Sequence, residues 1–241
     1  MQTRSPPIAL VLFLITGLTP FFSTAQPVMP DYTAVTDERL LNPEARNWLS
    51  YRGTLDGWGF SRLDEIDDSN VQQLEPVWSF STGVLGGHEA PPIVNNGVMF
   101  VTTPGNLVYA IDAASGDLLW RYQHDLPETY IAFHRTNRGV ALYGDKVYTA
   151  TLDARVVALD ATTGRKVWDS TVQDNNFGYY ITMAPLAIDG KILVGTSGGE
   201  LGIRGFIVAL DAETGEEVWR TYTVPAPGEP GNETWPGESW R

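Results

Sequence analysis

The stretch "ALDATTGRKVW", Ala158–Trp168, decides the fold, because the chain carries a copy of it on either side. The segments "AIDAASGDLLW" (Ala110–Trp120) and "ALDAETGEEVW" (Ala209–Trp219) align with it without gaps, at a spacing of about 50 residues. Each copy places Asp, then Ser or Thr, then Gly at a turn, and follows the turn with a strand that ends in Trp. Three copies in register indicate an internal repeat, which a single hairpin would not.

The residues that precede each copy are typical of β-strands. The runs "GVMFVTT", "DKVYTAT" and "KILVGT" are rich in β-branched and apolar residues, and no helical period of 3.6 residues is sustained over them. A repeat of this length built from short antiparallel strands is typical of a propeller blade. Because one blade cannot bury both of its faces, blades stack around an axis. The sequence therefore predicts an all-β β-propeller, of which this chain supplies roughly the first three to four blades.

Tryptophan marks the contact between the predicted blades. Trp120, Trp168 and Trp219 stand at the same place in each copy, so we expect them to pack against neighbouring blades and not to enclose a cofactor. The earlier stretch "PVWSFSTG" (Pro76–Gly83) is similar to the last strand of a blade whose other strands lie elsewhere, as when the two ends of a chain close a ring.

Composition excludes several classes of partner. The 241 residues are 43% hydrophobic, which is ample for a large core, and they carry a net charge of −13. Such acidity argues against a nucleic-acid partner and disfavours anionic membrane surfaces, whereas a basic soluble partner would be attracted. The chain has no cysteine. We therefore expect neither disulfides nor a CxxCH site for a c-type haem.

The two ends of the chain differ from the repeats. Residues 1–25 combine Arg4, the apolar run "IALVLFLITGL" and small residues before Gln26, and this pattern predicts a secretory signal peptide, with a single N-terminal anchor as the alternative. Residues 26–241 are then a partial propeller domain that lacks its C-terminal blades. The other interpretation is that the ring closes by assembly with another chain, of which a homodimer is one form.

The repeats and the segments between them resemble the quinoprotein alcohol dehydrogenases, the methanol and ethanol dehydrogenase family that uses pyrroloquinoline quinone (PQQ). The resemblance runs from Asn47 to Trp240, and its most specific motifs are "GHEAPP" (87–92), "NRGVA" (137–141) and "GGELGIRG" (198–205). It implies an eight-bladed propeller with PQQ and a metal, Ca²⁺ or a lanthanide, at its axis. This chain would supply a little under half of that ring.

The resemblance also assigns site residues. The residues that match the family's cofactor site are Glu89, Arg138, Thr182, Ser197, Gly198 and Gly199, and the residue that matches its metal-ligating glutamate is Glu200. PQQ carries three carboxylates, which suit a guanidinium fork, hydroxyls and bare glycine amides. Hard cations such as Ca²⁺ favour carboxylate oxygens.

Each assignment has a structural alternative. Glu200 could be an exposed acid on a glycine-rich turn, and Arg138 could form an ion pair between blades. Thr182 and Ser197 could cap strand ends. Glu89 beside a polyanion is costly unless its carboxyl is protonated or well bonded. Arg204, four residues after Glu200, is expected to form a structural ion pair.

The chain departs from the family's pattern in two places. Many members have two adjacent cysteines where this chain has Ala132 and Phe133, and we hypothesise that Phe133 supplies a flat contact to PQQ in their place. The family's catalytic aspartate, its metal-binding asparagine and the tryptophan that stacks on PQQ match later blades, outside residues 1–241. The sequence therefore predicts half a site and no catalytic residue in this chain.

The resemblance implies a periplasmic enzyme. It would oxidise a small-molecule alcohol by hydride transfer to metal-bound PQQ and pass the electrons to a cytochrome c. The alternative is a non-enzymatic propeller that serves as a binding or assembly scaffold, which the Trp-bearing repeat alone would allow. The motifs around Glu89, Arg138 and Glu200 favour the enzyme.

Overall fold

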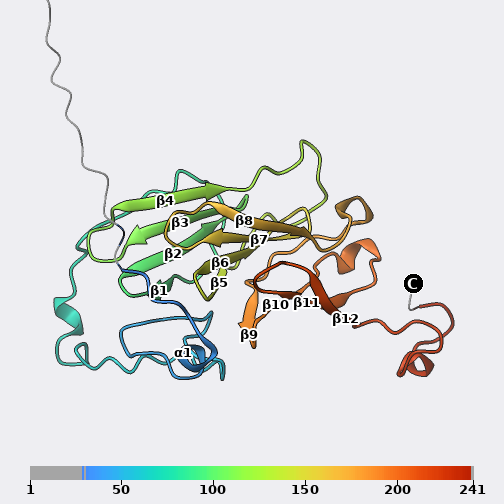
Figure 1. Ribbon diagram of the computed structural model, residues 1–241, viewed down its shortest axis with the longest axis horizontal. Helices are drawn as coiled ribbons and strands as arrows, with labels where there is room; N and C mark the ends of the chain where they lie inside the picture. The colour runs from blue at the N-terminus through green and yellow to red at the C-terminus, as the bar shows by residue number, and fades with distance from the viewer. Residues whose placement is uncertain (1–28, 30, 240–241) are drawn as a thin grey trace, which may run out of the picture.

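The protein folds into three four-stranded sheets arranged side by side (Figure 1). The computed structural model describes residue 29 and residues 31–239, so the predicted signal peptide, 1–25, lies outside the described residues. Within these residues no helix is long and apolar enough to cross a membrane. The sheets carry the repeated sequence, one copy each, and confirm the prediction of an all-β fold that is part of a propeller.

All three sheets have the same antiparallel order, in which each strand pairs with the next one along the chain. The first sheet contains β1 (Ile93–Asn95), β2 (Val98–Thr103), β3 (Leu107–Asp112) and β4 (Leu118–Gln123). The second contains β5 (Val140–Tyr143), β6 (Lys146–Ala150), β7 (Arg155–Asp160) and β8 (Lys166–Thr171). The third contains β9 (Leu186–Ile188), β10 (Lys191–Gly195), β11 (Phe206–Asp211) and β12 (Glu217–Tyr222).

The repeat builds the same turn in each sheet. In the second sheet the Asp160 carboxylate accepts hydrogen bonds from the backbone amides of Thr162 and Thr163, and Gly164 follows with a φ of +68°. Asp112 and Asp211 make the equivalent bonds in the other sheets. The register of the last two strands then shifts at the same repeat position in every sheet, which is a β-bulge. The motif thus fixes both the turn and the bulge.

Tryptophan joins each sheet to the next, as predicted from the spacing. The Trp120 indole N–H donates to the carbonyl oxygen of Ala161 at 2.9 Å, and a Cβ added at Gly164 would lie 2.6 Å from the indole ring. The glycine of the turn therefore makes room for the neighbour's tryptophan. Trp78 docks in the same way on the first sheet, with its N–H 3.1 Å from the Ala113 carbonyl oxygen, although its segment, Pro76–Gly83, forms no strand in the described part of the chain.

The segment before the first sheet fastens the sheets together. It contains the short helix α1 (Asp37–Leu41), pairs through single bridges with Gly144 and Val94, and is followed by the 3-10 turn η1 (Val71–Gln73). The connections after the second sheet contain η2 (Asn175–Phe177), η3 (Gly199–Leu201) and η4 (Asn232–Thr234). The buried core runs through the inner strands of all three sheets.

Candidate functional site

The residues predicted to bind the cofactor lie where the first strand of each sheet begins. Glu89 precedes β1, Arg138 precedes β5 and Thr182 precedes β9, each by a few residues. Ser197 follows β10, which runs antiparallel to β9, so its position is at the same end of the third sheet. Segments far apart in the sequence are therefore brought together at the same ends of the strands.

Four of these side chains form a continuous polar chain. The Arg138 guanidinium lies 2.9 Å from the Glu89 carboxylate and donates to the Thr182 hydroxyl at 2.6 Å. The Thr182 hydroxyl in turn lies 3.2 Å from the Ser197 hydroxyl. The backbone supports the same contact, since the Arg138 amide donates to the Thr182 carbonyl oxygen at 2.9 Å. The ion pair considered as the structural alternative for Arg138 is therefore present, and it is made with another predicted site residue.

Exposure distinguishes the two ends of this polar chain. The side chains of Arg138 and Glu89 are 40% and 48% exposed, whereas Thr182 is buried. A guanidinium that is fixed by a carboxylate and a hydroxyl, yet still open to solvent, has donors left for an incoming anion. The pairing also compensates the Glu89 charge, which was the physical objection to an acid at this place.

The glycine-rich segment after Ser197 has one position that only glycine suits. Gly198 has a φ of +118°, and a Cβ there would collide with the backbone carbonyl oxygen of Gly178. A Cβ at Gly199 would meet nothing within 4 Å. The segment is therefore packed on one side and open on the other, and Glu200 stands exposed on the short turn η3.

Tyr180 was given no role from the sequence, because Thr182, two residues later, was the residue matched to the cofactor site. It is buried, and its backbone pairs with that of Ser197. Burial, and after it the Glu200 carboxylate, raises the pKa of the Tyr180 phenol.

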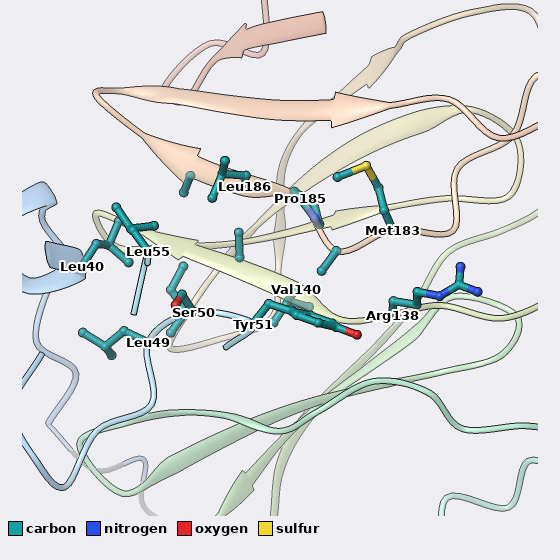
Figure 2. A pocket seen from close by; sticks show the side chains of 14 residues that line it. Leu40, Leu49, Ser50, Tyr51, Leu55, Arg138, Val140, Met183, Pro185 and Leu186 are labelled. Carbon is teal, nitrogen blue, oxygen red and sulfur yellow. The ribbon is translucent and has the colours of Figure 1, made fainter. Parts of the chain in front are cut away.

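An apolar cavity of about 400 Å³ lies next to this polar chain (Figure 2). It is bounded by β5, by the chain that leads into β9 and by the N-terminal segment, and Leu40 and Leu55 lie at the end away from Arg138. Met183 and Pro185 line the side nearer the third sheet. Arg138 therefore stands at the border between an apolar interior and the open polar edge.

Phe133 lies on the other side of the site. Its side chain is 60% exposed and lines an open hollow together with Glu89, Gly86 and Pro104. Phe133, which by resemblance stands in the place of one of the family's paired cysteines, therefore lines the same hollow as Glu89. The hypothesis of a flat apolar contact stays a prediction.

The prediction for Arg204 is confirmed. Its guanidinium forms an ion pair with Glu229 and stacks 3.8 Å from the centre of the Tyr222 ring. Its role is to hold the C-terminal loop on the third sheet.

No group of three or more acidic, histidine or cysteine side chains within residue 29 and residues 31–239 is arranged to hold a metal ion. Glu200 carries a carboxylate, which is the kind of ligand that Ca²⁺ or a lanthanide takes. The exposed carboxylate and the open glycine face are compatible with such a site.

The chain consists of three repeating sheets that tryptophan side chains join, which defines it as part of a β-propeller. The candidate polar site lies at the ends of the strands. A family model described as the glucose/ethanol/alcohol dehydrogenase β-propeller domain, of the PQQ type, matches residues 48–241. The chain belongs to this family.

The relatives found by sequence and by structure agree. The chain is 44% identical over 188 residues to the quinohemoprotein alcohol dehydrogenase ADH-IIG of Pseudomonas putida. The aligned region covers 76% of this chain and 26% of that protein. The solved structure of ADHIIG from Pseudomonas putida HK5 superposes with a TM-score of 0.76 at 41% identity, covering 80% and 29% of the two chains. A europium-containing methanol dehydrogenase gives a TM-score of 0.78 at 35% identity, covering 84% and 40%.

The chain therefore spans between about a quarter and two fifths of the length of these relatives. Its three sheets correspond to part of a ring, as predicted.

Proposed function

We propose that this chain is the N-terminal part of an exported PQQ-dependent alcohol dehydrogenase, and that it supplies the half of the cofactor site that holds the anionic groups of PQQ. The observation that carries the proposal is the chain of contacts from Glu89 through Arg138 and Thr182 to Ser197. These residues come from segments next to three different sheets.

Each residue has a role in this proposal. Arg138 offers its free donors to a carboxylate or quinone oxygen, and the hydroxyls of Thr182 and Ser197 donate to carboxylates. Gly198 and Gly199 let the backbone approach a flat ring closely, and their amides are further donors. Glu89 bonds the cofactor while its pairing with Arg138 fixes both side chains.

Glu200 is proposed as a ligand of Ca²⁺ or a lanthanide. Its exposed carboxylate, on a turn with glycine on both sides, can reach a cation with either or both oxygens. The europium-containing methanol dehydrogenase supports a lanthanide as the alternative to Ca²⁺ at this site.

PQQ supplies the redox chemistry when it is bound, as the acceptor of hydride from an alcohol. The catalytic base would come from residues beyond this chain. We propose a cytochrome c as electron acceptor, for which a chain with a net charge of −13 offers an attractive acidic surface. The quinohemoprotein relatives carry haem by name, which fits one-electron transfer to a haem protein.

The test uses the full-length protein, purified without cofactor and titrated with PQQ in the presence of Ca²⁺ or La³⁺. We expect saturable binding, seen in the PQQ absorbance, and alcohol-dependent reduction of an acceptor dye. Glu200→Gln should abolish the dye reduction that depends on added metal. Glu216→Gln, at an exposed acid on the β11–β12 turn, should leave this activity unchanged. A protein that binds no PQQ under these conditions would favour the non-enzymatic scaffold.

Export to the periplasm is part of the proposal and has its own test. Residues 1–25 should be cleaved from the secreted protein, so the mature N-terminus determined by mass spectrometry should begin near Gln26. An intact N-terminus on membrane-bound protein would show the anchor instead.

A further inference from the structure

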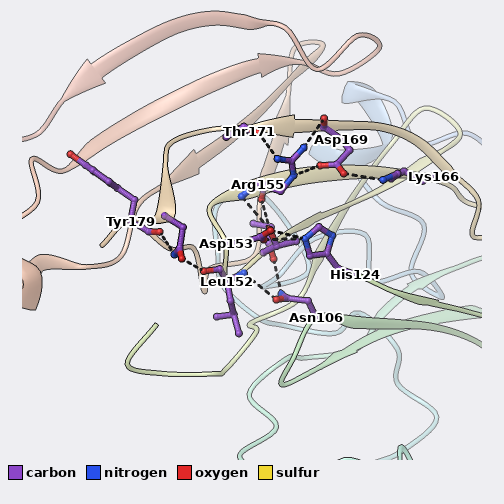
Figure 3. A network of polar contacts seen from close by, with 12 residues as sticks. Asn106, His124, Leu152, Asp153, Arg155, Lys166, Asp169, Thr171 and Tyr179 are labelled. Atoms are coloured by element: carbon purple, nitrogen blue, oxygen red, sulfur yellow. Dashed lines mark hydrogen bonds and ion pairs between the residues drawn. The ribbon is translucent and has the colours of Figure 1, made fainter. Parts of the chain in front are cut away.

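Asn175 bonds to more backbone groups than a loop asparagine needs for its own turn. Its side-chain amide donates to the carbonyl oxygens of Ile131 at 2.8 Å, Tyr179 at 2.7 Å and Leu152 at 3.2 Å. Its side-chain oxygen accepts from the Ile131 amide at 2.7 Å. Two of these partners, Leu152 and Tyr179, are labelled in Figure 3. Both backbone groups of Ile131 are thus held by one side chain.

The loop that Asn175 holds is the one that carries Phe133. Ile131 is two residues before Phe133, and two residues after it the Arg135 carbonyl oxygen accepts from the Gly105 amide at 3.3 Å. The loop is therefore tied down on both sides of Phe133, while the phenyl ring itself stays 60% exposed. A large apolar side chain on an anchored backbone is held at a fixed place in the open hollow that it shares with Glu89.

The bond from Asn175 to Tyr179 reaches the segment that leads to the third sheet. Tyr179, whose carbonyl oxygen Asn175 binds, is followed by Tyr180, which pairs with Ser197, and then by Thr182. One amide group thus connects the Phe133 loop with the segment that carries the Thr182 hydroxyl and whose Tyr180 pairs with Ser197.

We propose that Asn175 is a positioning residue for the cofactor, which fixes Phe133 as an apolar wall of the hollow that Glu89 also lines. This inference rests on the proposed function and extends it to a residue that lies outside the matched motifs. An amide is suited to the role, because it presents donors and an acceptor at once, as this mixture of carbonyl oxygens and one N–H requires. A carboxylate would place negative charge against three carbonyl oxygens.

The experiment is a double-mutant cycle on the full-length protein, with the dissociation constant for PQQ as the readout. Phe133→Ala and Asn175→Ala should each weaken PQQ binding by about tenfold, and the double variant should be little weaker than Phe133→Ala alone. Asn176→Ala is the matched control. Its side chain is exposed and makes none of these bonds, so its dissociation constant should equal that of the wild type.

The outcomes separate the two proposals. If the wild type binds no PQQ, the proposed function fails and this inference fails with it. If the wild type binds PQQ but Asn175→Ala weakens binding by the same factor with and without Phe133, then Asn175 acts through general structure and the positioning role is overturned. Should Asn175→Ala not fold, Asn175→Gln, which keeps the amide on a longer stem, replaces it in the same cycle with the same expectations.

Discussion

The indole N–H of Trp168 donates to the carbonyl oxygen of Ala212 at 3.1 Å, and this bond joins the second sheet to the third. Trp219 holds the same place in the last copy of the repeat, is 39% exposed, and donates to no carbonyl among the described residues. One sequence position therefore has two environments, according to whether another sheet lies beside it.

This contrast predicts different costs for the same substitution. Trp168→Phe should lower the free energy of unfolding by about 1–3 kcal/mol, because it removes a hydrogen bond and part of the ring that fills the space over Gly215. Trp219→Phe, measured in the same 241-residue chain by urea denaturation, should cost less than about 0.5 kcal/mol. Equal losses for the two variants would show that the tryptophans do not act through the neighbouring sheet.

The glycines before Glu200 give a second matched pair. Gly198→Ala forces a Cβ against the Gly178 carbonyl oxygen at a φ of +118°, so we expect a loss of about 2–3 kcal/mol in stability. Gly199→Ala meets open space and should leave stability nearly unchanged. If Gly199 faces the cofactor, Gly199→Ala should instead weaken PQQ binding in the full-length protein, which a titration beside the thermal melt would show.

The repeat predicted much of this fold because the same turn and the same contact between sheets are encoded in each of its three copies. Asp, a hydroxyl residue and Gly specify the turn, and a tryptophan of constant spacing specifies the contact with the next sheet. The β-bulge at Ala158 and the helix α1 were not predicted. A bulge depends on how two strands pair, and α1 is a five-residue helix whose Thr36 cap alone is too weak a signal.

The site could be predicted only through resemblance. Glu89, Arg138 and Thr182 are separated by more than 40 residues along the chain, and no periodicity says that their side chains meet. The contacts of Asn175 were likewise hidden, because an asparagine that bonds to distant backbone looks the same in sequence as one in an ordinary turn. Long-range polar contacts of this kind depend on the assembled sheets.

The fork of Arg138 gives a third prediction. Arg138→Lys keeps the charge but loses the planar set of donors that reaches Glu89 and Thr182 together, so PQQ affinity in the full-length protein should fall about 10- to 100-fold. Stability should change by less than about 1 kcal/mol, since the side chain is 40% exposed. An unchanged dissociation constant would leave Arg138 as an ion-pair partner only.

A buried contact between His124 and Asp153, which joins the first two sheets, predicts a specific dependence of stability on pH. The His124 ring nitrogen lies 3.0 Å from both carboxylate oxygens of Asp153, and the Thr151 hydroxyl donates to the same carboxylate at 2.5 Å (Figure 3). Burial alone would raise the pKa of the Asp153 carboxyl, but the bonds from His124 and Thr151 outweigh it and hold the pKa below its ordinary value.

Because the pKa of Asp153 is depressed by folding, its contribution to stability is present above the unfolded value of about 3.9 and is lost as the pH falls through the folded value. Asp153→Asn should therefore cost about 2–4 kcal/mol near neutral pH, and the difference from the wild type should shrink as the pH is lowered through about 4 and below. Urea denaturation at a series of pH values measures this difference directly. Asp125→Asn, at the exposed acid that follows His124 in the sequence, is the control and should show little effect at any pH. A loss for Asp153→Asn that stays constant between neutral and acidic pH would mean that its packing, and not its charge, stabilises the contact between the sheets.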